Sequence, residues 1–285
     1  MNSTAVNAAM ERALGKALKS NLLLRFLSAA ILAPAFYFIV EAGDLAFASL
    51  MLLGALWAGY EWLMMVNPRG QKAVWVPVLF SLALSWGVAL QTDIPTSVIL
   101  CLSVSLVLMV LFRIFKVQKP VLLSMSVSYI GSAMLGLLAM RQIGPAGFSL
   151  TVFVCAAVWL TDTGAYFCGR ILRGVRLAPD ISPSKTWAGF IGGIGAALLT
   201  AGLFIALFHP HKPYGVLAVA GFLSLSAQCG DLFESWVKRQ AGVKDSGELI
   251  PGHGGLLDRI DGLIMAVLLF WAALWATHND LSWWV

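Results

Sequence analysis

Four polar side chains lie on one face of a predicted helix, at the end of an apolar stretch. Counted from Asp231, the residues Glu234, Ser235 and Lys238 follow at three, four and seven positions, so all four share one side of an α-helix. Carboxylates grouped in this way bind cations, and lysine and serine side chains bind phosphate oxygens. The alternative is an ordinary solvated face on which Glu234 and Lys238 form an i,i+4 pair.

A glycine-rich segment follows this helix and leads into the last apolar stretch. Residues 242–255 contain five glycines and one proline, so the backbone can turn tightly and direct N–H groups at an anion. Asp258 and Asp261 come next, at i and i+3 on the first turn of a predicted helix. We expect them to face the helix of Asp231 across a cleft, because converging carboxylates hold Mg²⁺ beside substrate phosphates.

Two more residues of this segment carry groups that can contact a substrate. Arg259 lies between the two aspartates in sequence, and we expect its side chain to point away from them and to fork onto a phosphate. His253 is flanked by glycines and is a candidate base, a candidate phosphate donor or a simple turn residue.

A third polar group lies upstream. Asp162 interrupts an apolar run, where a carboxylate without a partner is costly, so it should meet a cation or a polar cavity. The alternative is a structural aspartate that is hydrogen-bonded to Thr161 or Thr163. Further along, a Ser-Pro-Ser-Lys-Thr sequence precedes a predicted helix and can present hydroxyl, N–H and ammonium groups to a phosphate. Its candidate ligands are Ser182, Ser184, Lys185 and Thr186.

The composition indicates which class of protein positions these residues. Only 12% of the 285 residues are charged, against about 25% in globular domains, and 59% are hydrophobic. A disordered chain needs few apolar residues, and a soluble domain of this size has too little interior to bury so many. We therefore predict an all-α, polytopic integral membrane protein with about nine transmembrane helices.

The nine apolar runs are long enough, or nearly so, to cross a hydrocarbon core of about 30 Å. Their approximate bounds are 22–40, 45–66, 74–90, 96–112, 121–140, 149–169, 187–208, 214–234 and 262–277. The third and the ninth run are short. Glu61, near the inner end of the second run, is assigned to an interface or to packing and is not a site candidate.

The basic residues indicate the orientation. With nine spans, 17 of the 19 Lys and Arg residues fall on one side, and only Arg141 and Lys212 fall on the other. Short cytoplasmic loops carry the basic excess, so the N-terminus is predicted to be cytoplasmic and the three polar groups lie at cytoplasmic helix ends. The net charge of +5 then reflects orientation and attraction to membrane lipids, and no nucleic-acid partner is expected.

The first 20 residues are predicted to form an interfacial helix, because apolar and basic side chains separate on two faces. The alternative is a secretory signal whose apolar region is 22–33, but eight further spans favour an uncleaved helix. We divide the chain into residues 1–150, with the interfacial helix and five spans, and residues 151–285, with the polar groups and the cytoplasmic loop, where we expect any catalytic chemistry to lie. Both belong to a single membrane-embedded unit.

The segment 235–261 resembles the signature of the phosphatidate cytidylyltransferase family, also called CDP-diacylglycerol synthases. It reads SWVKRQAGVKDSGELIPGHGGLLDRID, and every fixed position of the signature is filled. Residues 162–166, 178–187 and 230–235 resemble the upstream elements of the family. The likeness is firm over roughly residues 155–275. Before that, it rests on hydropathy and topology.

The resemblance implies transfer of a cytidylyl group from CTP to phosphatidic acid, which yields CDP-diacylglycerol and pyrophosphate. It also implies a requirement for Mg²⁺, often assisted by a monovalent cation such as K⁺. A homodimer in the inner membrane of the cell, with its active site on the cytoplasmic side, is implied as well.

Site residues are also implied by motif position. Asp231 and Asp258 resemble the cation-binding pair of the family. The other implied catalytic residues are Lys238, Arg239, Lys244, Asp245, His253, Arg259 and Asp261. The implied substrate-binding residues are Asp162, Ser182, Ser184, Lys185, Thr186, Glu234, Ser235, Gly254 and Gly255.

Two other functions stay open. A related CTP-dependent enzyme, such as an ether-lipid cytidylyltransferase or a polyprenol kinase, is disfavoured by the complete signature. An ion-coupled transporter predicts charges near the membrane midplane and two similar halves with broken helices. Here the acidic residues gather at one face and in one half of the chain, which argues against a transporter.

Overall fold

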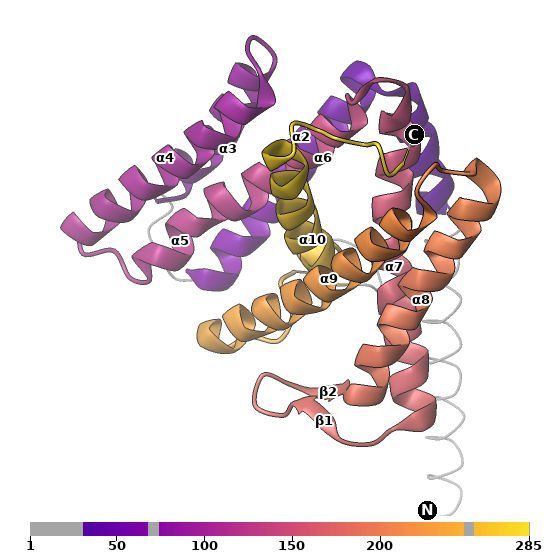
Figure 1. The fold of residues 1–285 in the computed structure, drawn as a ribbon. Coiled ribbons are helices and arrows are strands. Elements are labelled where there is room, and N and C mark those ends of the chain that lie inside the picture. The colour runs from indigo at the N-terminus through magenta and orange to yellow at the C-terminus, as the bar shows by residue number, and fades with distance from the viewer. Residues whose placement is uncertain (1–30, 68–73, 248–253, 285) are drawn as a thin grey trace, which may run out of the picture.

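The computed structural model describes residues 31–67, 74–247 and 254–284 of the 285-residue chain. These residues are mostly helical (Figure 1). The predicted interfacial helix at residues 1–20, the start of the first apolar run and His253 lie outside the described residues.

The helices follow the predicted apolar runs. A helix at Ile31–Ala42 precedes α2 (Asp44–Val66), α3 (Trp75–Ala89) and α4 (Ile94–Ile114). The next span consists of α5 (Pro120–Ser126), the π-helical turn η2 (Val127–Gly131) and α6 (Ser132–Arg141). After the 3-10 turn η3 (Gly144–Ala146) come α7 (Gly147–Leu172), α8 (Trp187–Phe208), α9 (Pro213–Ala241) and α10 (Leu257–Ala276).

Among the described residues, seven helical segments are long and apolar enough to cross a membrane, and the first helix and α3 are apolar but shorter. The prediction of an all-α, polytopic membrane protein is confirmed. α9 extends seven residues past its predicted run and ends where Gly242 adopts the left-handed conformation, at φ 75°. α10 begins five residues before its run, because the polar residues 258–261 form its first turn.

One element departs from the helical prediction. β1 (Arg176–Ala178) and β2 (Ser182–Thr186) form an antiparallel hairpin that connects α7 to α8. Pro179 and Asp180 occupy its turn, as suits both residue types. The hairpin lies at one end of these two helices (Figure 1). The Ser-Pro-Ser-Lys-Thr sequence therefore forms the strand β2, which leads directly into the first residue of α8.

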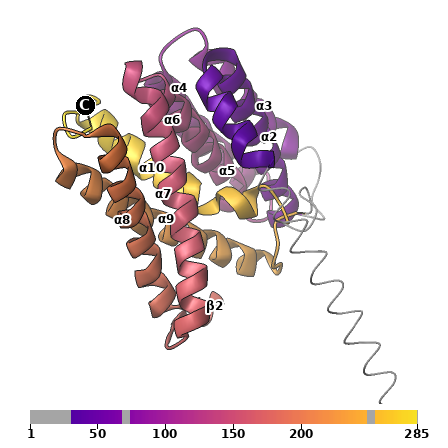
Figure 2. The ribbon, with the colours of Figure 1, turned by 90° about the vertical axis from the view of Figure 1, so that its right-hand side faces the viewer.

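α7 and α8 lie side by side in both views (Figures 1 and 2). Their close approach depends on glycine. A Cβ atom built at Gly164 would lie 2.8 Å from the carbonyl oxygen of Gly192, and one built at Gly192 would overlap Cβ of Cys168. The backbones of α7 and α8 are therefore in close contact. This contact sets the position of the two helices relative to each other and of the hairpin that connects them.

We expect Gly192→Ala to lower the free energy of unfolding by about 1–3 kcal/mol, the usual penalty for overpacking. Gly195→Ala is the matched control, because a methyl group on this residue of the same helix meets nothing within 4 Å. Thermal unfolding of both variants in detergent measures the difference. Equal unfolding midpoints would contradict the close approach of α7 and α8.

The buried core joins the N-terminal helices to those that carry most of the polar residues. In α2, the indole N–H of the buried Trp62 donates to the carbonyl oxygen of Leu122, at 2.7 Å. Tyr129, in the π-helical turn, packs on Phe233 of α9 with ring centroids 5.3 Å apart. α10 packs against both α6 and α9. The first half of the chain thus supports the position of α9 and α10.

Candidate active site

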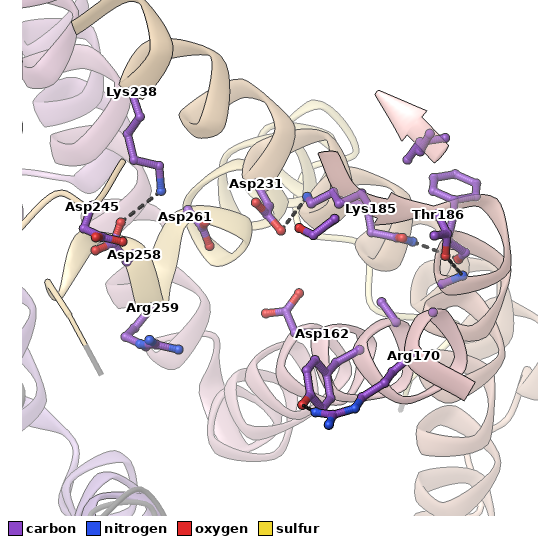
Figure 3. Close-up of a pocket in the computed structure, with 18 residues that line it drawn as sticks. Asp162, Arg170, Lys185, Thr186, Asp231, Lys238, Asp245, Asp258, Arg259 and Asp261 are labelled. Carbon is purple, nitrogen blue, oxygen red and sulfur yellow. Dashed lines mark hydrogen bonds and ion pairs between the residues drawn. The ribbon is translucent and has the colours of Figure 1, made fainter. Parts of the chain in front are cut away.

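A cavity of about 680 Å³ lies between α7, α8, β2, α9 and α10 (Figure 3). Its polar lining includes Asp162, Arg170, Ser184, Lys185, Thr186, Gln228, Asp231, Lys238, Asp245, Asp258, Arg259 and Asp261. The three polar groups that are separate in the sequence therefore meet in one place. The predicted cleft between Asp231 and the first turn of α10 is confirmed.

Asp231 projects from α9 and pairs with the strand β2. Its Oδ2 atom lies 2.5 Å from Nζ of Lys185, and its Oδ1 atom accepts a hydrogen bond of 3.4 Å from the hydroxyl of Ser235. The side chains of Asp231 and Lys185 remain 32% and 23% exposed. Both can therefore exchange their mutual contact for a ligand.

Asp258, on α10, is the acceptor on which the described ends of the glycine-rich segment converge. Its Oδ1 atom lies 2.9 Å from Nζ of Lys238 and 3.2 Å from the N–H nitrogen of Ser246. Its Oδ2 atom accepts from the N–H groups of Ser246 and Gly255, both at 3.1 Å. These donors fix the carboxylate firmly at one wall of the cavity.

Lys238 is a buried cation shared by two acids. Besides Asp258, its Nζ atom contacts Oε1 of Glu234 at 3.2 Å, and Glu234 is fully buried. The predicted i,i+4 pair of Glu234 and Lys238 therefore forms, but it is buried, so these two residues do not belong to an ordinary solvated helix face. Within the described residues, Oε2 of Glu234 has no hydrogen-bond partner.

Asp162 faces the cavity from α7 (Figure 3). The neighbouring threonine hydroxyls do not hold it, because they donate to backbone carbonyls one turn earlier. Thr161 donates to Ala157 at 2.8 Å, and Thr163 donates to Trp159 at 2.9 Å. The cavity interpretation of Asp162 is thus favoured over the structural one.

Three of the aspartates form an acidic side of the cavity. Asp162, Asp231 and Asp261 are close enough for their charges to repel one another, while Lys185 and Arg259 partly offset the charge of Asp162. In the described ranges, no group of three or more acidic, His or Cys side chains is arranged to hold a metal ion alone. Mg²⁺ commonly takes one or two carboxylates and completes its shell with phosphate oxygens and water. The donors present fit that kind of site.

Several predicted residues lie outside the cavity lining: Ser182, Glu234, Ser235, Arg239, Lys244, Gly254 and Gly255. Arg239 instead donates from Nε to the carbonyl oxygen of Ile181 at 3.2 Å, which ties α9 to the hairpin. Lys244 is exposed. Arg259, which lies between Asp258 and Asp261 in the sequence, lines the same cavity as they do (Figure 3).

The lining also includes residues that were not predicted, among them Gln228 and Arg170. Gln228 lies one turn before Asp231 and donates to the carbonyl oxygen of Phe190 at 3.3 Å. The sequence signal for Gln228 was a single polar amide side chain within an apolar run. Arg170 lies two turns after Asp162, and its guanidinium is 2.5 Å from the hydroxyl of Tyr166.

The sequence matches the cytidylyltransferase family over residues 23–277. A Bacillus subtilis protein named phosphatidate cytidylyltransferase is 35% identical over 266 residues, which cover 88% of this chain and 98% of the relative. A Brucella melitensis protein of that name is 53% identical over 144 residues, 50% of this chain and 53% of the relative. A third, from Haemophilus influenzae, is 48% identical over 130 residues, 44% and 45% of the two chains. The chain thus spans about half the length of the Brucella and Haemophilus relatives.

Proposed function

The chain belongs to the cytidylyltransferase family, and we propose that it transfers the cytidylyl group of CTP to phosphatidic acid, with release of pyrophosphate. The product is CDP-diacylglycerol, an activated lipid for phospholipid synthesis. The observation that carries this proposal is the single cavity in which Lys185, Asp231, Asp258 and Arg259 meet. It combines cationic donors for phosphates with carboxylates for a metal ion.

The reaction brings two polyanions together. An oxygen of the lipid phosphate attacks the α-phosphorus of CTP, a new P–O bond forms, and the bond to pyrophosphate breaks in line with it. Lys185 and the fork of Arg259 are suited to neutralise phosphate oxygens as they approach. Thr186 is the N-cap of α8, where its side chain accepts from the N–H of Gly189, and the positive end of a helix dipole favours an anion at this point. A phosphate monoester is already ionised at neutral pH, so His253 is not needed as a base.

We assign Mg²⁺ to Asp231 and Asp258, which line the same cavity from α9 and α10. A magnesium ion held by these two carboxylates would supply positive charge to offset the negative charge that develops on the phosphate oxygens. Asp258 already accepts from Lys238 and from two backbone N–H groups, so Asp231 supplies the more available oxygens. Asp162 and Asp261 offer further oxygen donors, including for a monovalent cation such as K⁺.

The long apolar helices make this a membrane protein. We place it in the bacterial inner membrane with the cavity on the cytoplasmic side, because its relatives are bacterial and because the nine-span topology predicted from the sequence assigns 17 of the 19 basic residues to one side. The family resemblance is the support for a homodimer.

A labelling experiment tests the proposal. Purified protein is incubated in detergent with phosphatidic acid, Mg²⁺ and CTP that is radiolabelled either at the α- or at the γ-phosphorus. We expect label in the lipid fraction from α-labelled CTP alone, and none when EDTA removes Mg²⁺. Diacylglycerol, which lacks the attacking phosphate, is the control acceptor.

Other outcomes would identify the competing functions. A lipid kinase would transfer the γ-label to an alcohol such as a polyprenol. Absence of α-label from the lipid fraction over a range of acyl chains and cations would reject the proposed reaction.

A further inference from the structure

Glu61 is a buried acid of α2 that contacts the glycine-rich segment. The residue is only 3% exposed, and both of its carboxylate oxygens accept hydrogen bonds. Oε1 accepts from the indole N–H of Trp57 at 2.9 Å and from the N–H of Leu256 at 3.0 Å. Oε2 accepts from the N–H of Leu257 at 2.7 Å and from the hydroxyl of Ser246 at 3.4 Å. Four donors thus converge on one buried carboxylate.

This carboxylate serves as the cap of α10. The first N–H groups of a helix need an acceptor from outside it, and the residue before α10 is Leu256, whose side chain supplies none. Glu61 reaches these N–H groups from a helix almost 200 positions earlier in the chain. Its negative charge also lies at the positive end of the α10 dipole, where it is stabilising.

The same contacts determine where Asp258 lies. Ser246 gives its hydroxyl to Glu61 and its N–H to Asp258, at 3.4 and 3.1 Å respectively. Leu257, whose N–H binds Glu61, directly precedes Asp258. Glu61 therefore holds the Ser246 side chain within the glycine-rich segment and the start of the helix that carries the proposed metal ligand.

The space around Glu61 explains one glycine of the signature. A Cβ atom built at Gly255 would lie 2.7 Å from Oε2 of Glu61 and would overlap the hydroxyl of Ser246. Any side chain at this position would displace the carboxylate or the serine. Gly255 is therefore required by the packing around Glu61, although it does not line the cavity.

We propose that Glu61 is a positioning residue for cytidylyl transfer: it holds the ends of the glycine-rich segment so that Asp258 and Lys238 keep their places in the cavity. The activity part of this inference rests on the function proposed above. The structural part, that Glu61 binds the N–H groups of Leu256 and Leu257, stands independently of the reaction.

Glu61→Gln tests the proposal, because glutamine keeps the shape but turns one acceptor into a donor facing other donors. We expect turnover to fall about 10- to 100-fold, the usual effect of removing a residue that orients a metal ligand. We also expect a higher Mg²⁺ concentration for half-maximal rate, and faster hydrogen exchange in peptides covering residues 254–262. Glu41→Gln, at an exposed glutamate, is the matched control and should change none of these.

A second variant keeps the test informative if Glu61→Gln folds poorly. Gly255→Ala should perturb the same contacts and give the same rise in exchange and in Mg²⁺ requirement. Unchanged exchange over residues 254–262 in both variants would overturn the inference, even if turnover fell. If wild-type protein forms no labelled lipid but exchange still separates Glu61→Gln from Glu41→Gln, the proposed reaction fails and the positioning contact is supported.

Discussion

Asp231→Asn should reduce turnover by roughly a hundred- to a thousand-fold or more, the range found when one group that stabilises transition-state charge is removed. Asparagine keeps the shape of the side chain but loses the charge that we assign to Mg²⁺. Asp231 and its partner Lys185 are both partly exposed. Loss of their ion pair should therefore lower the free energy of unfolding by at most about 1 kcal/mol. The α-label transfer assay and the unfolding midpoint together measure both effects.

Asp180→Asn is the matched control, because Asp180 is an exposed aspartate at the hairpin turn and does not line the cavity. Its turnover should equal that of the wild type. Full activity in Asp231→Asn would rule out Asp231 as a metal ligand. An inactive variant that is also unfolded would leave Asp231→Glu as the informative comparison, since it retains the charge and moves its position.

Lys238→Met should destabilise the protein strongly as well as inactivate it. Lys238 contacts Glu234, which is fully buried, and Asp258, and methionine leaves both acids without their cation. Removing one partner of a buried ion pair costs about 3–5 kcal/mol, because the remaining charge is uncompensated. We expect a large fall in the thermal unfolding midpoint and no measurable lipid labelling.

A double variant separates charge from packing in this prediction. Combining Lys238→Met with Glu234→Gln removes one of the orphaned charges, so part of the lost stability should return while activity stays absent. Lys116→Met, at an exposed lysine in the turn after α4, is the control and should behave as wild type. A wild-type unfolding midpoint in Lys238→Met would contradict the buried ion pair.

The fold and the centre of the site were predictable because their signals are local. Apolar runs of membrane length determine most helices, and the i, i+3 spacing of Asp258 and Asp261 places both on one turn facing Asp231. The hairpin was missed since β1 and β2 have only three and five residues, too few to show a period of two. Arg259 lines the cavity together with Asp258 and Asp261, because the cavity extends around the first turn of α10.

Glu61 could not be assigned from the sequence for a different reason. Its partners Leu256 and Leu257 donate from backbone N–H groups, which every residue except proline carries. The contact therefore cannot be predicted from residue types. The acid alone, within an apolar run, was the visible signal. Only the packing of α2 beside the start of α10 reveals which donors it meets.

The ion pair between Lys185 and Asp231 has a thermodynamic consequence for how the binding of two ligands is coupled. Each group is in contact with the other, and a ligand that binds either one would have to replace this contact. A cation that binds Asp231 releases Lys185, and a phosphate that binds Lys185 releases Asp231. Affinity at one position therefore rises when the other is filled, and the two effects must be equal. We therefore expect the metal ion and the nucleotide to bind with positive cooperativity.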